Sequence, residues 1–144
     1  YGRLKFQRVY FSAYQKGLGH PDIPGEKRLL SNPQNIFLRE HRLYQTDFLI
    51  RRYGFKNEDI VFDKNGNLSL DKDPKQIWAD THPEFYPIKI NSADKEALLR
   101  VPGLGLESVS KILEARRERK IYRTEDLGIK GKRAEKIKQY AVCG

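Results

Sequence analysis

The residues best suited to binding chemistry lie in a short turn, Val101-Pro102-Gly103-Leu104-Gly105, between two helical patterns. A phosphate needs several N–H donors that converge on one point. Gly103 and Gly105 can take positive φ, so the turn can be tight and its backbone can come close to a ligand. The turn leads directly into a second helical pattern, whose first amides lack internal partners and carry partial positive charge. The pattern therefore predicts a backbone anion site where Gly105 meets Leu106.

Side chains around this turn complete the predicted site. Pro102 fixes the entry angle of the second helix, and Leu104 is expected to point into a core shared by the two helices. Ser108 and Lys111 are placed to add a hydroxyl and a charge beside the anion. A weaker echo of the turn, Leu127-Gly128-Ile129-Lys130-Gly131, opens the most basic stretch of the chain. The predicted nucleic-acid-binding residues are Pro102, Gly103, Leu104, Gly105, Leu106, Ser108, Lys111, Lys130, Gly131, Lys132, Arg133 and Lys136.

The distribution of charge agrees with a polyanionic partner. The chain of 144 residues has a formal net charge of +9. Residues 88–144 have a net charge of +6 and residues 1–87 of +3, so the excess is concentrated in the segment with the turn. Backbone contacts of this kind do not depend on base sequence and weaken steeply with salt. The alternative is a basic, solvated surface with no target.

The pattern of elements predicts a mainly α fold with a minor β part. After a boundary near Pro87 we expect four to five short helices, including 92–100, 106–119 and 131–141, with Asn91 or Ser92 capping the first. Before the boundary we expect a strand over 7–13, a loop over 15–35 and a long helix over 37–53. Short strands are predicted at 60–63 and 67–70 around a turn at Asn65-Gly66, and then a helix from Pro74 to Thr81, capped by Asp73 and anchored by Trp78.

The stretch 90–140 resembles the helix-hairpin-helix pairs of the bacterial competence DNA receptor and of the excision-nuclease incision subunit. In those families the hairpin amides take DNA phosphates, a role that falls here to Gly103, Gly105 and Leu106. The chain departs from the pattern in two places. Val109 stands where a small residue is usual, and the glycine spacing of the second hairpin is irregular.

Residues 8–143 also resemble the C-terminal third of a family of radical SAM proteins assigned to DNA modification or repair. Blocks at 38–49, 53–55 and 70–79, followed by the hairpin, carry this resemblance. It implies an N-terminal partial barrel whose Cys-x3-Cys-x2-Cys motif holds a [4Fe–4S] cluster and binds S-adenosylmethionine. That motif is not in this sequence. The resemblance therefore implies that the chain is the tail of the barrel, over 1–87, plus a DNA-binding domain, over 88–144, of an enzyme whose reaction it does not specify.

Few residues suggest catalysis by this chain alone. His41, Gln45 and Asp47 share one predicted helix and could face a substrate, but a polar face paired with Arg39 and Arg42 is the simpler interpretation. Asp126 is the one aspartate placed as in a base-excision glycosylase, and its surroundings do not match. No His or Cys spacing suggests a metal site.

The single cysteine, Cys143, excludes an internal disulfide and favours a reducing cytoplasm. The sequence has no apolar run of about 18 residues, so we expect no membrane span.

Three functions compete on this evidence. The first is binding of the DNA backbone without sequence specificity, as part of a radical SAM protein. The second is a docking module that contacts its own barrel or another protein and no nucleic acid. The third, a self-sufficient lyase or glycosylase, has the least support, because no catalytic set accompanies the hairpin.

Overall fold

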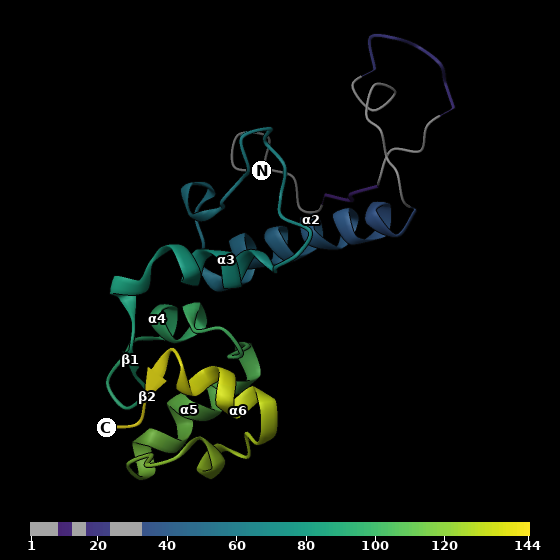
Figure 1. Cartoon of the computed structure of the whole chain (residues 1–144). Helices are drawn as coiled ribbons and strands as arrows, with labels where there is room; N and C mark the ends of the chain where they lie inside the picture. Colours follow the sequence, from purple (N-terminus) through teal and green to yellow (C-terminus); the bar gives the residue numbers. More distant parts are fainter. Residues whose placement is uncertain (1–8, 13–16, 24–32) are drawn as a thin grey trace.

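The computed structural model describes residues 9–12, 17–23 and 33–144. Five α-helices and one parallel pair of short strands lie in these residues, which confirms a mainly helical fold with a minor β part. In Figure 1, α2 and α3 lie side by side above a smaller group formed by α4, α5, α6 and the strand pair. None of the helices in the described residues is long and apolar enough to cross a membrane.

The long helix α2 spans Pro33–Tyr53 and so begins four residues earlier than the predicted 37–53. The loop predicted over 15–35 was therefore too long at its C-terminal end. A proline suits the first turn of a helix, because its missing N–H would have no intrahelical partner there. The helix ends as predicted, at Gly54, whose φ of +72° is the left-handed conformation of many helix ends.

The strands predicted in the first part of the chain do not occur in the residues that the structure describes. Residues 9–12, the described part of the predicted strand 7–13, have no strand structure, and neither do 60–63 and 67–70. At the Asn65-Gly66 turn, the Asp63 carboxylate accepts hydrogen bonds of 2.8 Å from the N–H groups of Asn65 and Asn67. The Asp63 carboxylate thus accepts hydrogen bonds from N–H groups that could otherwise pair with a neighbouring strand.

Helix α3 spans Pro74–Thr81, as predicted. Asp73 caps it, since its carboxylate accepts a hydrogen bond of 2.9 Å from the N–H of Gln76. Trp78 is 4% exposed and packs with Leu49 of α2, Phe55 and Ile60 in one apolar cluster. The predicted anchoring role of Trp78 is confirmed.

The C-terminal part contains α4 (Lys95–Arg100), α5 (Leu106–Glu118) and α6 (Gly131–Lys138), with one 3-10 turn at Thr124–Leu127. The cap of α4 is Asp94, which accepts a hydrogen bond of 2.7 Å from the N–H of Ala97, and not the predicted Asn91 or Ser92. These helices enclose a second cluster of buried aliphatic residues that runs from Ile88 to Ala141. The predicted boundary at residue 87 falls between the two clusters, although Tyr53 and Tyr86 touch both.

A short parallel pairing closes this second cluster. Strand β1 (Ile88–Lys89) pairs with β2 (Ala141–Val142), which ends α6 at Lys138 and not at the predicted residue 141. Asn91 reinforces the pairing. Its amide donates to the carbonyls of Ile121 and Cys143 and accepts a hydrogen bond from the N–H of Ile121. One side chain therefore joins three segments of the chain.

Replacement of Asn91 by alanine should lower the free energy of unfolding by about 2 kcal/mol or more, because three hydrogen bonds of partly buried backbone groups are lost. Urea unfolding followed by circular dichroism measures this change. Ser92→Ala is the matched control: Ser92 is exposed, and its replacement should change stability by less than about 0.5 kcal/mol. Equal effects of the two variants would contradict the structural role assigned to Asn91.

Candidate nucleic-acid interface

The first hairpin has the geometry that its apolar residues predict. Val101 and Leu104 are buried, with 0% and 2% of their surfaces exposed. Gly103 has a φ of +92°, and a Cβ atom there would lie 3.0 Å from Cγ1 of Ile137 in α6. Glycine is therefore required at this position for two separate reasons. Gly105, in contrast, is extended, with φ at −108°, so positive φ is not the reason for the second glycine.

At this corner two backbone carbonyls have side-chain partners, and the first N–H groups of the next helix have none among the described residues. The Gly103 carbonyl accepts a hydrogen bond of 2.8 Å from Nε of Arg133, and the Leu104 carbonyl accepts one of 2.6 Å from Nζ of Lys75. Gly105 is the N-cap of α5 and has no side chain to cap the helix. The N–H groups of Leu106, Glu107 and Ser108 consequently have no hydrogen-bond partner among the described residues.

Arg133 connects the two hairpins. In addition to the Gly103 carbonyl, its guanidinium contacts the hydroxyl of Ser108, which is only 8% exposed. Both residues were predicted to bind nucleic acid, and the structure places both in a link between α5 and α6. Pro102 and Leu104 are buried in the same way, so only their backbone borders the site. The link holds the N-termini of α5 and α6 close together.

The second hairpin opens α6 in a similar manner. Gly128 and Gly131 have φ values of +73° and +63°, and the N-cap residue Lys130 makes no capping bond with its side chain. Lys130 and Lys132 are exposed, and no ion pair involves either of them among the described residues. Lys136 is half-buried. The glycine spacing that departs from the known pattern therefore still gives a sharp turn before a basic helix.

One carboxylate lies at the predicted site. Glu107 stands in the first turn of α5, and its ion pair of 2.8 Å with Lys111 holds the pKa of the carboxyl below its usual value. The charge of Lys111, which was predicted to face the anion, is thereby compensated within the helix. Lys138 is likewise paired, with Glu125 at 3.0 Å. Lys130 and Lys132 are exposed cations beside the hairpins that have no ion pair among the described residues.

Lys75 and Tyr53, both from the first part of the chain, reach the corner, and the sequence analysis identified neither of them. Lys75 of α3 is 9% exposed, and its Nζ lies 4.9 Å from the centre of the Tyr53 ring. Burial lowers the pKa of Lys75 to about 7. The nearby charges of Lys136 and Arg133 contribute in the same direction, and Asp73 opposes them. The sequence carries no signal for this role, because a lysine in the first turn of a helix is ordinarily solvated.

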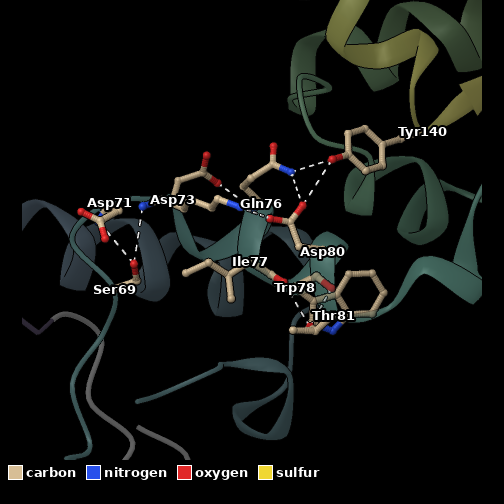
Figure 2. A network of polar contacts seen from close by, with 10 residues as sticks. Ser69, Asp71, Asp73, Gln76, Ile77, Trp78, Asp80, Thr81 and Tyr140 are labelled. Atoms are coloured by element: carbon tan, nitrogen blue, oxygen red, sulfur yellow. Dashed lines mark hydrogen bonds and ion pairs between the residues drawn. The ribbon is translucent and has the colours of Figure 1, made fainter.

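Helix α3 is fixed against the hairpins by a second contact. Figure 2 shows Gln76 and Asp80 of α3 directed toward Tyr140, which follows α6. Nε2 of Gln76 donates to the Tyr140 hydroxyl at 2.7 Å and to the Asp80 carboxylate at 2.8 Å. Since Lys75 precedes Gln76, this network sets the position of the lysine at the corner.

His41 is exposed, and most of the other candidate residues have structural contacts. Gln45 accepts a hydrogen bond of 2.7 Å from Arg42, one of the two arginines of the polar-face interpretation. Asp47 is buried and pairs with Arg51, which that interpretation did not include. Asp126 accepts hydrogen bonds from the N–H groups of residues 122 and 123. Burial raises the pKa of the Cys143 thiol, which disfavours the reactive thiolate form.

Comparison of the chain with models of known families, with curated proteins and with solved structures gives no match. The two resemblances drawn from the sequence therefore stay predictions.

Lys75 should make stability depend on pH. Between pH 7 and about 10.5 the unfolded chain keeps a proton on this lysine that the folded chain has lost, so the free energy of unfolding rises with pH in this window. We expect the wild-type chain to gain about 2–4 kcal/mol relative to Lys75→Met between pH 7 and 10. Urea unfolding of both proteins across this range measures the difference. Parallel pH profiles would show that Lys75 is protonated in the folded state throughout.

Proposed function

We propose that this chain binds the sugar–phosphate backbone of DNA, without sequence specificity, through its two hairpins. The unpaired N–H groups at the start of α5 carry this proposal. Their neighbouring carbonyls are already bonded to Lys75 and Arg133, so the corner offers donors and a partial positive charge to an anion. The exposed Lys130 and Lys132 at the start of α6 supply full charges beside it.

In this proposal the chain acts as the C-terminal part of a radical SAM protein of DNA modification or repair. The support is the resemblance of residues 8–143, together with the lack of a catalytic set at the hairpins. The [4Fe–4S] cluster and S-adenosylmethionine belong to the barrel that the resemblance implies, and no residue of this chain is assigned to them. The single cysteine agrees with a cytoplasmic protein.

A specific observation favours the second candidate, a docking module that binds no nucleic acid. The corner already touches its own chain, since Lys75 bonds to the Leu104 carbonyl and the Tyr53 hydroxyl lies 3.4 Å from where a Cβ of Gly105 would be. Docking of this kind uses carbonyls, however, and leaves the amides of α5 without partners. Titration with a 20-base-pair duplex at low and moderate salt separates the two candidate functions. A DNA-binding chain should bind the duplex at low salt and more weakly at moderate salt, whereas a docking module should not bind it at either salt concentration.

Leu106→Pro tests the amides directly. Proline removes the first N–H of α5 and fits the first helical position, and the extended Gly105 suits a residue before proline. Because a hydrogen bond to a charged group contributes about 1.5–3 kcal/mol, duplex affinity should fall tenfold or more. Leu106→Ala is the control, since it shortens the side chain and keeps the N–H. Fluorescence anisotropy measures both, and equal losses would exclude the amide as a ligand.

Lys132→Gln tests the second hairpin. Loss of one phosphate contact should weaken binding to all duplex sequences equally and reduce the slope of log affinity against log salt by about 1. The control is Lys64→Gln, which removes the same charge from an exposed turn next to the other apolar cluster. An unchanged slope for Lys132→Gln would remove the second hairpin from the proposal.

A further inference from the structure

A cavity of about 340 Å³ lies beside the hairpin corner, between α2, α3 and the first hairpin. Its apolar lining comes mainly from Phe48, Tyr53 and Pro74, and its polar lining includes Gln45, Lys75 and Arg133. A largely apolar pocket with a few convergent polar groups is typical of a ligand site. Among the lining residues from α2 and α3, only Lys75 contributes to the corner proposed above to bind the DNA backbone.

We propose that this cavity holds one unstacked nucleotide of the bound DNA, with its base against the ring of Phe48 and its phosphate toward the hairpin. This inference rests on the proposed function and makes it more specific. The substrate class becomes DNA with an unpaired nucleotide, such as a bulge, a gap or a single-stranded end.

Phe48 is the platform for the base. It is 43% exposed although it lies one residue before the buried Leu49, and its only ring contact among the described residues is with Tyr53, at 5.5 Å between centroids. An open aromatic face in a cavity can stack on any base, and such stacking contributes about 1–3 kcal/mol per base. Stacking explains why a large apolar side chain stands open beside a basic site.

The polar groups of the cavity match a nucleotide. They are the guanidinium of Arg133 and the amine of Lys75, against one carboxylate, that of Asp73, which is already bonded to the N–H of Gln76. The side-chain oxygen of Gln45 accepts a hydrogen bond from Arg42, while its Nε2 has no partner among the described residues and can donate to an acceptor on a base edge.

The position of the cavity requires the base to leave the stack. Gly103 and Gly105 line the cavity and lead directly to the unpaired amides of α5, so the phosphate and base sites are adjacent. A base inside a paired duplex is turned inward and cannot reach a pocket beside its own phosphate. An unpaired nucleotide can enter, because it has already lost part of its stacking energy.

The test compares two DNA molecules and three proteins. One DNA is a fully paired 20-base-pair duplex, and the other is the same duplex with a single unpaired nucleotide at its centre. The proteins are the wild-type chain, Phe48→Ala and the matched control Phe37→Ala. Phe37 is 71% exposed on the same helix, about 16 Å away along its axis. Anisotropy titrations give each affinity, and circular dichroism checks folding.

The wild-type chain should bind the DNA with the unpaired nucleotide about tenfold more tightly than the paired duplex. Phe48→Ala should lose this preference and keep its affinity for the paired duplex, while Phe37→Ala keeps both. Should Phe48→Ala fail to fold, Phe48→Leu replaces it, because leucine fills the site and offers no aromatic face. 2-Aminopurine at the unpaired position should change its fluorescence when the wild-type chain binds. It should not change when Phe48→Ala binds.

Equal wild-type affinity for the two DNA molecules would overturn the nucleotide pocket and leave the backbone-binding function intact. The same holds if Phe37→Ala loses the preference as completely as Phe48→Ala. Failure to bind either DNA at low salt would instead overturn the proposed function itself.

Discussion

The need to satisfy buried backbone polar groups determines how the hairpin corner is built. A tight turn exposes both carbonyls and amides, and each needs a partner or access to water. Here two basic side chains, Lys75 and Arg133, donate hydrogen bonds to the carbonyls of Leu104 and Gly103. The acceptors are thereby turned into the protein, and the donors at the start of α5 are left for something else. A corner with unsatisfied carbonyls would repel the anion that its amides attract.

Because of this arrangement, the site depends on residues from both parts of the chain. Arg133 comes from α6, and Lys75 comes from α3, which Gln76 holds against Tyr140. An ion pair between Arg100 of α4 and Asp59, at 2.9 Å, joins the same two parts, and the Arg100 guanidinium lies 4.3 Å from the centre of the Trp78 ring. The hairpins are therefore not an independent appendage in this structure, because their shape depends on residues before Pro87.

The helices were predictable because local signals determine them. Asp73 with Pro74 fixed the start of α3, Gly54 fixed the end of α2, and the apolar spacing around Gly103 gave α5 within one residue of its end. The strands were not predictable. Those expected around Asn65-Gly66 are replaced by local hydrogen bonds to Asp63, and the real pairing joins residues over 50 positions apart. Lys75 was missed for the same reason, because burial by a distant segment leaves no local pattern.

The pairing of β1 with β2 also bears on how the molecule acquires its structure during synthesis. Ile88 pairs with Ala141, and Asn91 bonds to the Cys143 carbonyl, so the aliphatic cluster cannot be completed until residues 141–143 have left the ribosome. Contacts between residues far apart in sequence form slowly, because the entropy of loop closure is lost before the contacts contribute any favourable energy. The nascent segment would thus display apolar surface until β2 has been translated, the stage at which a chaperone can engage it.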